Sequence, residues 1–135
     1  MYQQQAQQSK YFENSIQTAS KEQLLIMLYN GAIRFCKTAI EAMKQQRYDE
    51  VHTNIVKAQN IISEFVITLD RNAPVADSLL QLYDYYNHLL VTANMNKDTA
   101  SIEQVIGFLT EMRDTWVEAA KLAKTAPAPA GVKHV

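Results

Sequence analysis

The sequence predicts an all-α fold, an antiparallel up-and-down four-helix bundle with an N-terminal arm or short helix. Glycine and proline are scarce, at three each in 135 residues, so long stretches contain no helix breaker. Apolar residues recur at spacings of three and four, the period of a helix, and no segment alternates as a half-buried strand does. The predicted connections between helices are short, which makes neighbouring helices run in opposite directions.

Length and composition restrict the classes of protein to which this chain can belong. A chain of 135 residues is long enough for one domain with its own core. The 13 basic and 14 acidic residues nearly balance, so no nucleic-acid partner is expected. No apolar run is long enough for membrane insertion, and the glutamine-rich start does not resemble a secretory signal. The single cysteine, Cys36, fits a reducing compartment, so we expect a cytoplasmic protein with Cys36 buried.

Two short segments are predicted to flank the bundle. Residues 1–19 are glutamine-rich at their start and form an N-terminal arm, which is a short helix or disordered. Residues 125–135 are rich in alanine and proline and are predicted to be a disordered tail. The four-helix bundle is therefore expected to span residues 20–124.

The first long helix is apolar around too much of its circumference. Ser20 and Gln23 have the spacing of a capping box, and the helix that they begin runs to about Gln46. Its apolar residues cover an arc of roughly 200°, about twice the width needed to face one core. Either another helix of the chain or a partner must cover this surplus. The surplus edge consists of Ile26, Ile33 and Ile40.

The second helix is predicted from about Asp49 to Arg71 and has one clean apolar seam. The seam residues alternate at spacings of four and three, as they do in helices that pack by interdigitating side chains. We therefore expect all of them in the core. They are Val51, Ile55, Ala58, Ile62, Phe65 and Leu69.

Local signals also predict the starts of the third and fourth helices. Pro74 suits the first turn of the third helix, which continues to about Asn96. Ser101 with Gln104 is a second capping-box pattern and is predicted to begin the fourth helix. The apolar seam of this last helix includes Trp116.

No combination of residues indicates a catalytic, cofactor-binding or metal site. Bundles that hold metals with carboxylates use Glu-x-x-His on two helices. Here His52 follows Glu50 at the wrong spacing, and His88 has no glutamate three residues before it. The glycines are isolated, so no phosphate-binding loop is present. We therefore expect neither an enzyme nor a cofactor.

Surplus apolar residues on three helices are more informative and indicate a binding surface. Val56 and Ile67 lie almost opposite the seam of the second helix, and Leu80 and Val91 lie at the edge of the third. Tyr85 lies on the flank of the third helix. With the three isoleucines of the first helix, these residues are candidates for a groove that binds an amphipathic partner helix. Helix–helix homodimerisation through the same surface is the alternative.

Several blocks of sequence, in order and at matching spacing, resemble the flagellar secretion chaperone family, FliS. The resemblance covers about residues 11–124. Lys21 departs from it, because the family often has proline there. The blocks are YFENSIQTAS at 11–20, LLIMLYNG at 24–31, KAQNIISE at 57–64, LYDYY at 82–86, AN at 93–94, KD at 97–98 and EMRDTW at 111–116.

The resemblance implies a four-helix bundle that acts as a cytoplasmic chaperone for newly made flagellin. Such a chaperone binds the disordered C-terminal segment of flagellin, prevents premature polymerisation and presents the complex to components of the flagellar type III export gate. In the family, an N-terminal arm covers part of the apolar surface when no client is bound, which makes Tyr11 and Ile16 candidates for the cap. The homodimer stays an alternative for the client-free state. If the isoleucine edge is the groove, Ile33→Asp or Ile40→Asp should weaken binding with helicity largely intact.

Overall fold

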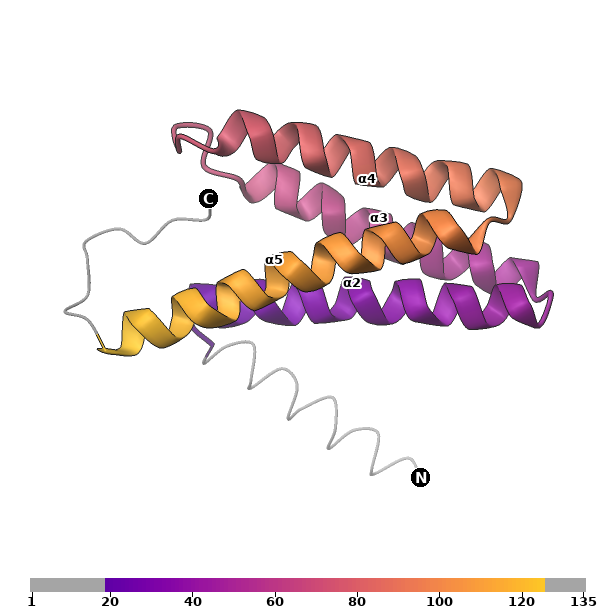
Figure 1. Cartoon of the computed structure of the whole chain (residues 1–135), viewed down its shortest axis with the longest axis horizontal. Coiled ribbons are helices and arrows are strands. Elements are labelled where there is room, and N and C mark those ends of the chain that lie inside the picture. Colours follow the sequence, from indigo (N-terminus) through magenta and orange to yellow (C-terminus); the bar gives the residue numbers. More distant parts are fainter. Residues whose placement is uncertain (1–18, 126–135) are drawn as a thin grey trace, which may run out of the picture.

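The computed structural model describes residues 19–125, and the surroundings of side chains up to Leu122. Within this part of the chain there are four helices and no strand, which confirms the all-α prediction (Figure 1). The arm residues Tyr11 and Ile16, and nearly all of the C-terminal tail, lie outside the described residues. The helices are α2 (Lys21–Lys44), α3 (Tyr48–Thr68), α4 (Ala76–Asn96) and α5 (Thr99–Thr125).

The four helices form a closed ring in which each packs against two others. Helices α2 and α4 each contact both α3 and α5. His52, near the start of α3, and Asn94, near the end of α4, share a side-chain hydrogen bond of 2.8 Å, so these two helices are antiparallel. Figure 1 shows each helix running opposite to the one before it. The arrangement is an up-and-down bundle, as the short connections predict.

The predicted capping box at the start of α2 is present. The Ser20 hydroxyl accepts a hydrogen bond from the backbone N–H of Gln23 at 3.2 Å. The Gln23 side-chain oxygen in turn accepts one from the backbone N–H of Ser20 at 2.9 Å. The two bonds satisfy backbone donors that have no partner within the first turn of the helix.

The start of α5 differs from the prediction. The helix begins at Thr99, and Ser101 is a buried residue of its first turn. Asp98 takes the capping role: its Oδ1 accepts from the Ala100 backbone N–H at 2.9 Å, and its Oδ2 accepts from the Ser101 hydroxyl at 3.0 Å. The prediction was wrong because Asp98 is an equally good capping residue and lies earlier. The left-handed Lys97 (φ 55°) ends α4 directly before it.

The start of α4 also moves by two residues. Pro74 lies in the turn before the helix, and Ala76 is the first helical residue. The Ala76 N–H is bonded to the Ala73 carbonyl at 3.0 Å, which closes this turn. The α3–α4 connection is therefore a compact turn, and Pro74 rigidifies that turn instead of the helix.

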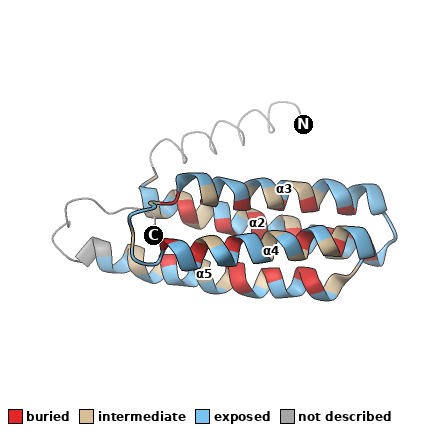
Figure 2. Cartoon of the chain, turned by 90° about the horizontal axis from the view of Figure 1, so that it is seen from above, coloured by how far each residue is buried: buried red, intermediate tan, exposed pale blue. Residues whose placement is uncertain are grey.

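The core confirms the apolar seams of the sequence. Figure 2 shows buried residues on the faces that the helices turn inward. The six residues of the predicted second seam, five in α3 and Leu69 directly after it, are all buried, as is Cys36. Five aromatic rings from all four helices pack together in the centre of the core: Tyr29, Phe65, Tyr83, Tyr86 and Phe108. Successive ring centroids lie between 4.1 and 6.2 Å apart, the range in which aromatic pairs stabilise a core.

A short chain of polar groups crosses this aromatic core. The hydroxyls of Tyr29 and Tyr83 are 2.9 Å apart and buried. Tyr29 is also hydrogen-bonded to the side chain of Trp116. Because an indole N–H can only donate, Trp116 donates to Tyr29, and Tyr29 is free to donate to Tyr83. The chain connects α2 to α5 and to α4, which lies diagonally across the bundle from α2. Burial raises the pKa of both tyrosines.

Candidate functional site

The surplus apolar edge of the first long helix is covered by the chain itself. Ile33 is 4% exposed and belongs to the core, and Ile26 and Ile40 are half-buried against that core. Ile33 lies beside Arg113 of α5 in the cleft between α2 and α5. Of the two ways to cover this edge that the sequence left open, another helix of the same chain accounts for most of it.

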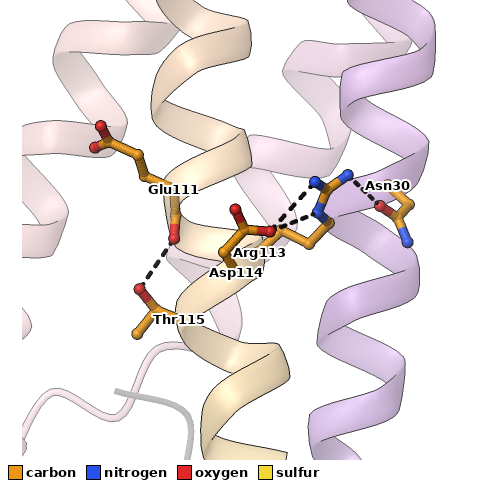
Figure 3. A network of polar contacts seen from close by, with 5 residues as sticks. All are labelled: Asn30, Glu111, Arg113, Asp114 and Thr115. Carbon is orange, nitrogen blue, oxygen red and sulfur yellow. Dashed lines mark hydrogen bonds and ion pairs between the residues drawn. The ribbon is translucent and has the colours of Figure 1, made fainter.

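Polar side chains fasten this covered side of the bundle. One guanidinium nitrogen of Arg113 donates to the Asn30 side-chain oxygen on α2 at 3.1 Å. The Nε and the other terminal nitrogen of Arg113 donate to Asp114 at 3.3 and 3.2 Å (Figure 3). On the same helix, the Thr115 hydroxyl donates to the carbonyl of Glu111, one turn earlier, at 2.9 Å. Because Arg113 bridges two helices, α5 is held against α2 along this edge.

A groove between α3 and α4 brings two predicted residues together, Ile67 and Leu80. It encloses a cavity of about 400 Å³. The hydrogen bond between His52 and Asn94 shows how the antiparallel helices α3 and α4 are aligned. Val66 is fourteen residues after His52 and Leu80 is fourteen residues before Asn94, so these two side chains lie opposite each other in the groove. We call it the α3–α4 groove. Its lining residues are Ile62, Ser63, Val66, Ile67, Leu80, Tyr83, Asp84 and Asn87.

The other predicted residues of these two helices extend or flank this groove. Four residues along from the His52–Asn94 bond, Val56 lies level with the Leu90–Val91 step of α4. Val56 is half-buried and Val91 is exposed. Tyr85 is 51% exposed and contacts Tyr86, whose ring stacks on Phe108 of α5. Tyr85 therefore lies on the α5 side of α4, apart from the groove.

The α3–α4 groove combines apolar walls with a hydrogen-bond acceptor that has no partner. Ile67 is 71% exposed, which is unusual for so large an apolar side chain. The side-chain oxygen of Asn87 is buried and makes no hydrogen bond with any described residue. Asp84 is the one charged residue among those that line the groove. Since buried acceptors are normally satisfied, the groove favours an apolar ligand that also supplies a donor.

A second groove, between α2 and α3, was missed in the sequence. It encloses a cavity of about 480 Å³. We call it the α2–α3 groove; it is lined by Met27, Leu28, Asn30, Gly31, Arg34, Phe35 and Ile61. Gly31 could have indicated this groove from the sequence, because a glycine in the middle of a helix with large apolar residues one turn away leaves a hollow on the helix surface. A Cβ at this position would lie 3.5 Å from the Ile61 side chain, in the groove.

Besides the cleft between α2 and α5, whose lining is mostly polar, the described part of the chain offers the α3–α4 and α2–α3 grooves to a polypeptide, and it contains no metal centre. Among residues 19–122, no three histidine, cysteine, aspartate or glutamate side chains come together as a metal site would require. None of the described helices combines the length and apolarity that crossing a membrane requires. The chemistry at hand is apolar burial and hydrogen bonding on either side of α3.

Comparison with known proteins gives one consistent family. The chain matches the family model "Flagellar protein FliS" over residues 2–123. It is 39% identical over 109 residues to the flagellar secretion chaperone FliS of Bacillus subtilis (strain 168), covering 81% of this chain and 82% of the relative.

More distant relatives agree. The flagellar secretion chaperone FliS of Salmonella typhimurium (strain LT2) is 30% identical over 107 residues, covering 77% of this chain and 79% of that protein. The Escherichia coli (strain K12) protein of the same name is 28% identical over 109 residues, covering 78% and 80%. The family model covers α2, α3, α4, both grooves and nearly all of α5, and the relatives agree with it. The resemblance seen in the sequence blocks is confirmed: the chain belongs to the FliS family of flagellar secretion chaperones.

Proposed function

We propose that this protein is a cytoplasmic export chaperone for flagellin. It binds the disordered C-terminal segment of flagellin, prevents premature polymerisation and delivers the client to the flagellar type III export apparatus. Family membership supports the general role. The structural observation that carries the binding step is the α3–α4 groove, where exposed apolar side chains lie beside a buried acceptor that makes no hydrogen bond with a described residue.

The groove fits the thermodynamics of binding a disordered segment. A disordered chain loses conformational entropy when it is ordered on a surface. Burial of apolar area, worth about 25 cal/mol per Å², offsets that loss. Much of the gain is cancelled by the ordering, so the net affinity is low for the area buried and release at the export gate stays feasible. Ile67 and Leu80 supply the apolar area, and Asn87 supplies an acceptor for a client donor.

Calorimetry with a peptide of the flagellin C-terminal segment tests this proposal. We expect the wild-type chaperone to bind, and Ile67→Asp to weaken binding at least about tenfold, because one buried isoleucine contributes about 1.5–3 kcal/mol. Met95→Asp is the matched control. Both residues are largely exposed, at 71% and 76%, and both are one residue from the end of their helix, but Met95 does not line the groove.

Two results would overturn the proposal. One is a folded wild-type protein that does not bind the flagellin peptide. The other is a stable homodimer, seen by sedimentation at several concentrations, that the peptide does not dissociate, which would favour the alternative of a structural dimer. The cap formed by Tyr11 and Ile16 stays a prediction that an N-terminal truncation can test in the same titration.

A further inference from the structure

We propose that the α2–α3 groove takes a second apolar segment of the client and that this segment carries a carboxylate, held between Arg34 and Lys57. The inference rests on the proposed function, because it assumes the flagellin C-terminal segment as client. It goes further in giving the segment a charge, a location and an orientation.

The two cations converge on one aromatic ring at the edge of the groove. The guanidinium carbon of Arg34 lies 5.5 Å from the centroid of the Phe35 ring. The Lys57 ammonium, from the neighbouring helix, lies 5.4 Å from the same centroid. Both distances are within the range of a cation–π interaction. Phe35 therefore gathers two positive charges, one from α2 and one from α3, beside the apolar groove.

Neither cation is neutralised within the described part of the chain. Among residues 19–122, neither Arg34 nor Lys57 takes part in an ion pair; the cations that do include Arg47, Arg113 and Lys121. Glu41 lies nearly two turns beyond Arg34 on α2, where it lines the cleft toward α5. On α3, Glu64 is nearly two turns beyond Lys57 and three residues past Ile61, toward the opposite end of the groove. The Phe35 end of the groove is thus positive, and the far end is not.

This charge distribution selects the occupant. An apolar segment that covers Leu28 and Ile61 also covers the sides of Arg34 and Lys57 and strips water from their charges. Removing water from an unpaired cation is unfavourable unless an anion replaces that water. A carboxylate on the segment restores the balance, and the planar guanidinium can bind it through two hydrogen bonds. A purely apolar or basic segment is disfavoured by the same groups.

The α3–α4 groove carries a negative charge where the α2–α3 groove carries positive ones, so a carboxylate of the client is expected in the α2–α3 groove only. Asp84 is its charged lining residue, and Asn87 offers an acceptor. A client that wraps across α3 would therefore place donors or cations in the α3–α4 groove and carboxylates beside Phe35. The two grooves together fix the direction in which the client lies on the chaperone.

Titration of the flagellin C-terminal peptide into the full-length chaperone tests the inference. We expect Arg34→Glu/Lys57→Glu to weaken binding at least tenfold, and Arg34→Gln/Lys57→Gln to weaken it about threefold. Added sodium chloride should weaken wild-type binding more than binding to the glutamine pair. A peptide whose aspartates and glutamates are replaced by asparagine and glutamine should lose affinity for wild type, and it should no longer bind wild type more tightly than the Arg34→Gln/Lys57→Gln chaperone.

The matched control is Lys21→Glu/Lys37→Glu, which changes net charge by the same amount at exposed residues of α2 outside the groove. We expect it to bind the peptide within twofold of wild type. Equal losses for the control and groove pairs, or no loss for the groove pair while wild type binds, would overturn the inference. No binding by folded wild type would instead overturn the proposed function, so the two failures are distinguishable.

Discussion

The two edges of helix α2 are similarly apolar, but only one of them is closed. The isoleucine edge, with Ile33 in the core, is covered by α5 and fastened by Arg113. The other edge, with Leu28 and Phe35, borders a groove over α3 that Gly31 leaves open. A wide apolar arc on a helix therefore predicts that another polypeptide segment packs against it. Whether the contact belongs to the fold or to a partner depends on the neighbouring helix.

The largest effect should separate these two edges directly. Ile33→Asp places a carboxylate in the core and should cost about 4 kcal/mol or more of unfolding free energy, which for a bundle of this size threatens the fold. Leu28→Asp is the control in the same helix. Because Leu28 is already 37% exposed, its substitution should cost about 1 kcal/mol or less. Urea unfolding followed by circular dichroism measures both; similar midpoints would contradict the assignment of the edges.

The next largest effect should be a loss of stability of the whole bundle at alkaline pH. Burial raises the pKa of the Cys36 thiol to about 12 and raises that of Tyr29 above its ordinary value, with the nearby Tyr83 adding to the shift. A raised pKa means that the folded state keeps a proton that the unfolded chain has released. Stability is therefore fully present below about pH 8.5 and is lost as pH rises, by about 1.4 kcal/mol per pH unit for each group.

Denaturation of wild type and Cys36→Ala at a series of pH values checks this expectation. The variant lacks the thiol, so its loss of stability should begin nearer pH 10, where the unfolded tyrosines ionise. An unchanged onset of the loss in Cys36→Ala would argue against the thiol as its source. Native Cys36 should also resist alkylation near neutral pH, because the reactive thiolate is both buried and disfavoured.

The buried hydroxyl chain should show a smaller, graded effect. Tyr83→Phe removes the acceptor of the Tyr29 hydroxyl, which keeps its bond from Trp116, and should cost about 1–2 kcal/mol. Tyr29→Phe should cost more, up to about 3 kcal/mol, because it also strands the indole N–H of Trp116. Tyr85→Phe, on the exposed flank, should stay within about 0.5 kcal/mol of wild type. The reverse ranking of the two core variants would show that Tyr29 is not the central member of the chain.

The two helical glycines should give the smallest change in stability and the clearest test of the open edge. Gly31→Ala and Gly107→Ala should each stabilise the bundle by about 0.5–1 kcal/mol, because glycine is a poor helix former. A Cβ at Gly31 makes an ordinary contact with Ile61, and one at Gly107 meets nothing within 4 Å. Only Gly31→Ala should lower affinity for the flagellin peptide, since it narrows the α2–α3 groove. Equal binding by both variants would place the client elsewhere.

The sequence by itself determined the helices, the core seams and the family. These features rest on local and periodic information. The Ser20–Gln23 capping box marks the start of a helix, and the spacing of three and four marks the seam residues from Val51 to Leu69 that are buried. Short connections impose antiparallel neighbours. Where the sequence prediction failed, as at Asp98 and Ser101, two residues competed for the same cap and only the backbone conformation selected one.

Only the tertiary structure decided which apolar surplus is closed and which is open. A helical wheel marks both Ile33 and Ile67 as apolar residues outside the core face of their helices, yet Ile33 is 4% exposed and Ile67 is 71% exposed. The difference comes from α5, which returns along α2 and leaves both sides of α3 with grooves. Burial depends on residues far away in the sequence, because apolar surface is removed from water only where another element packs against it.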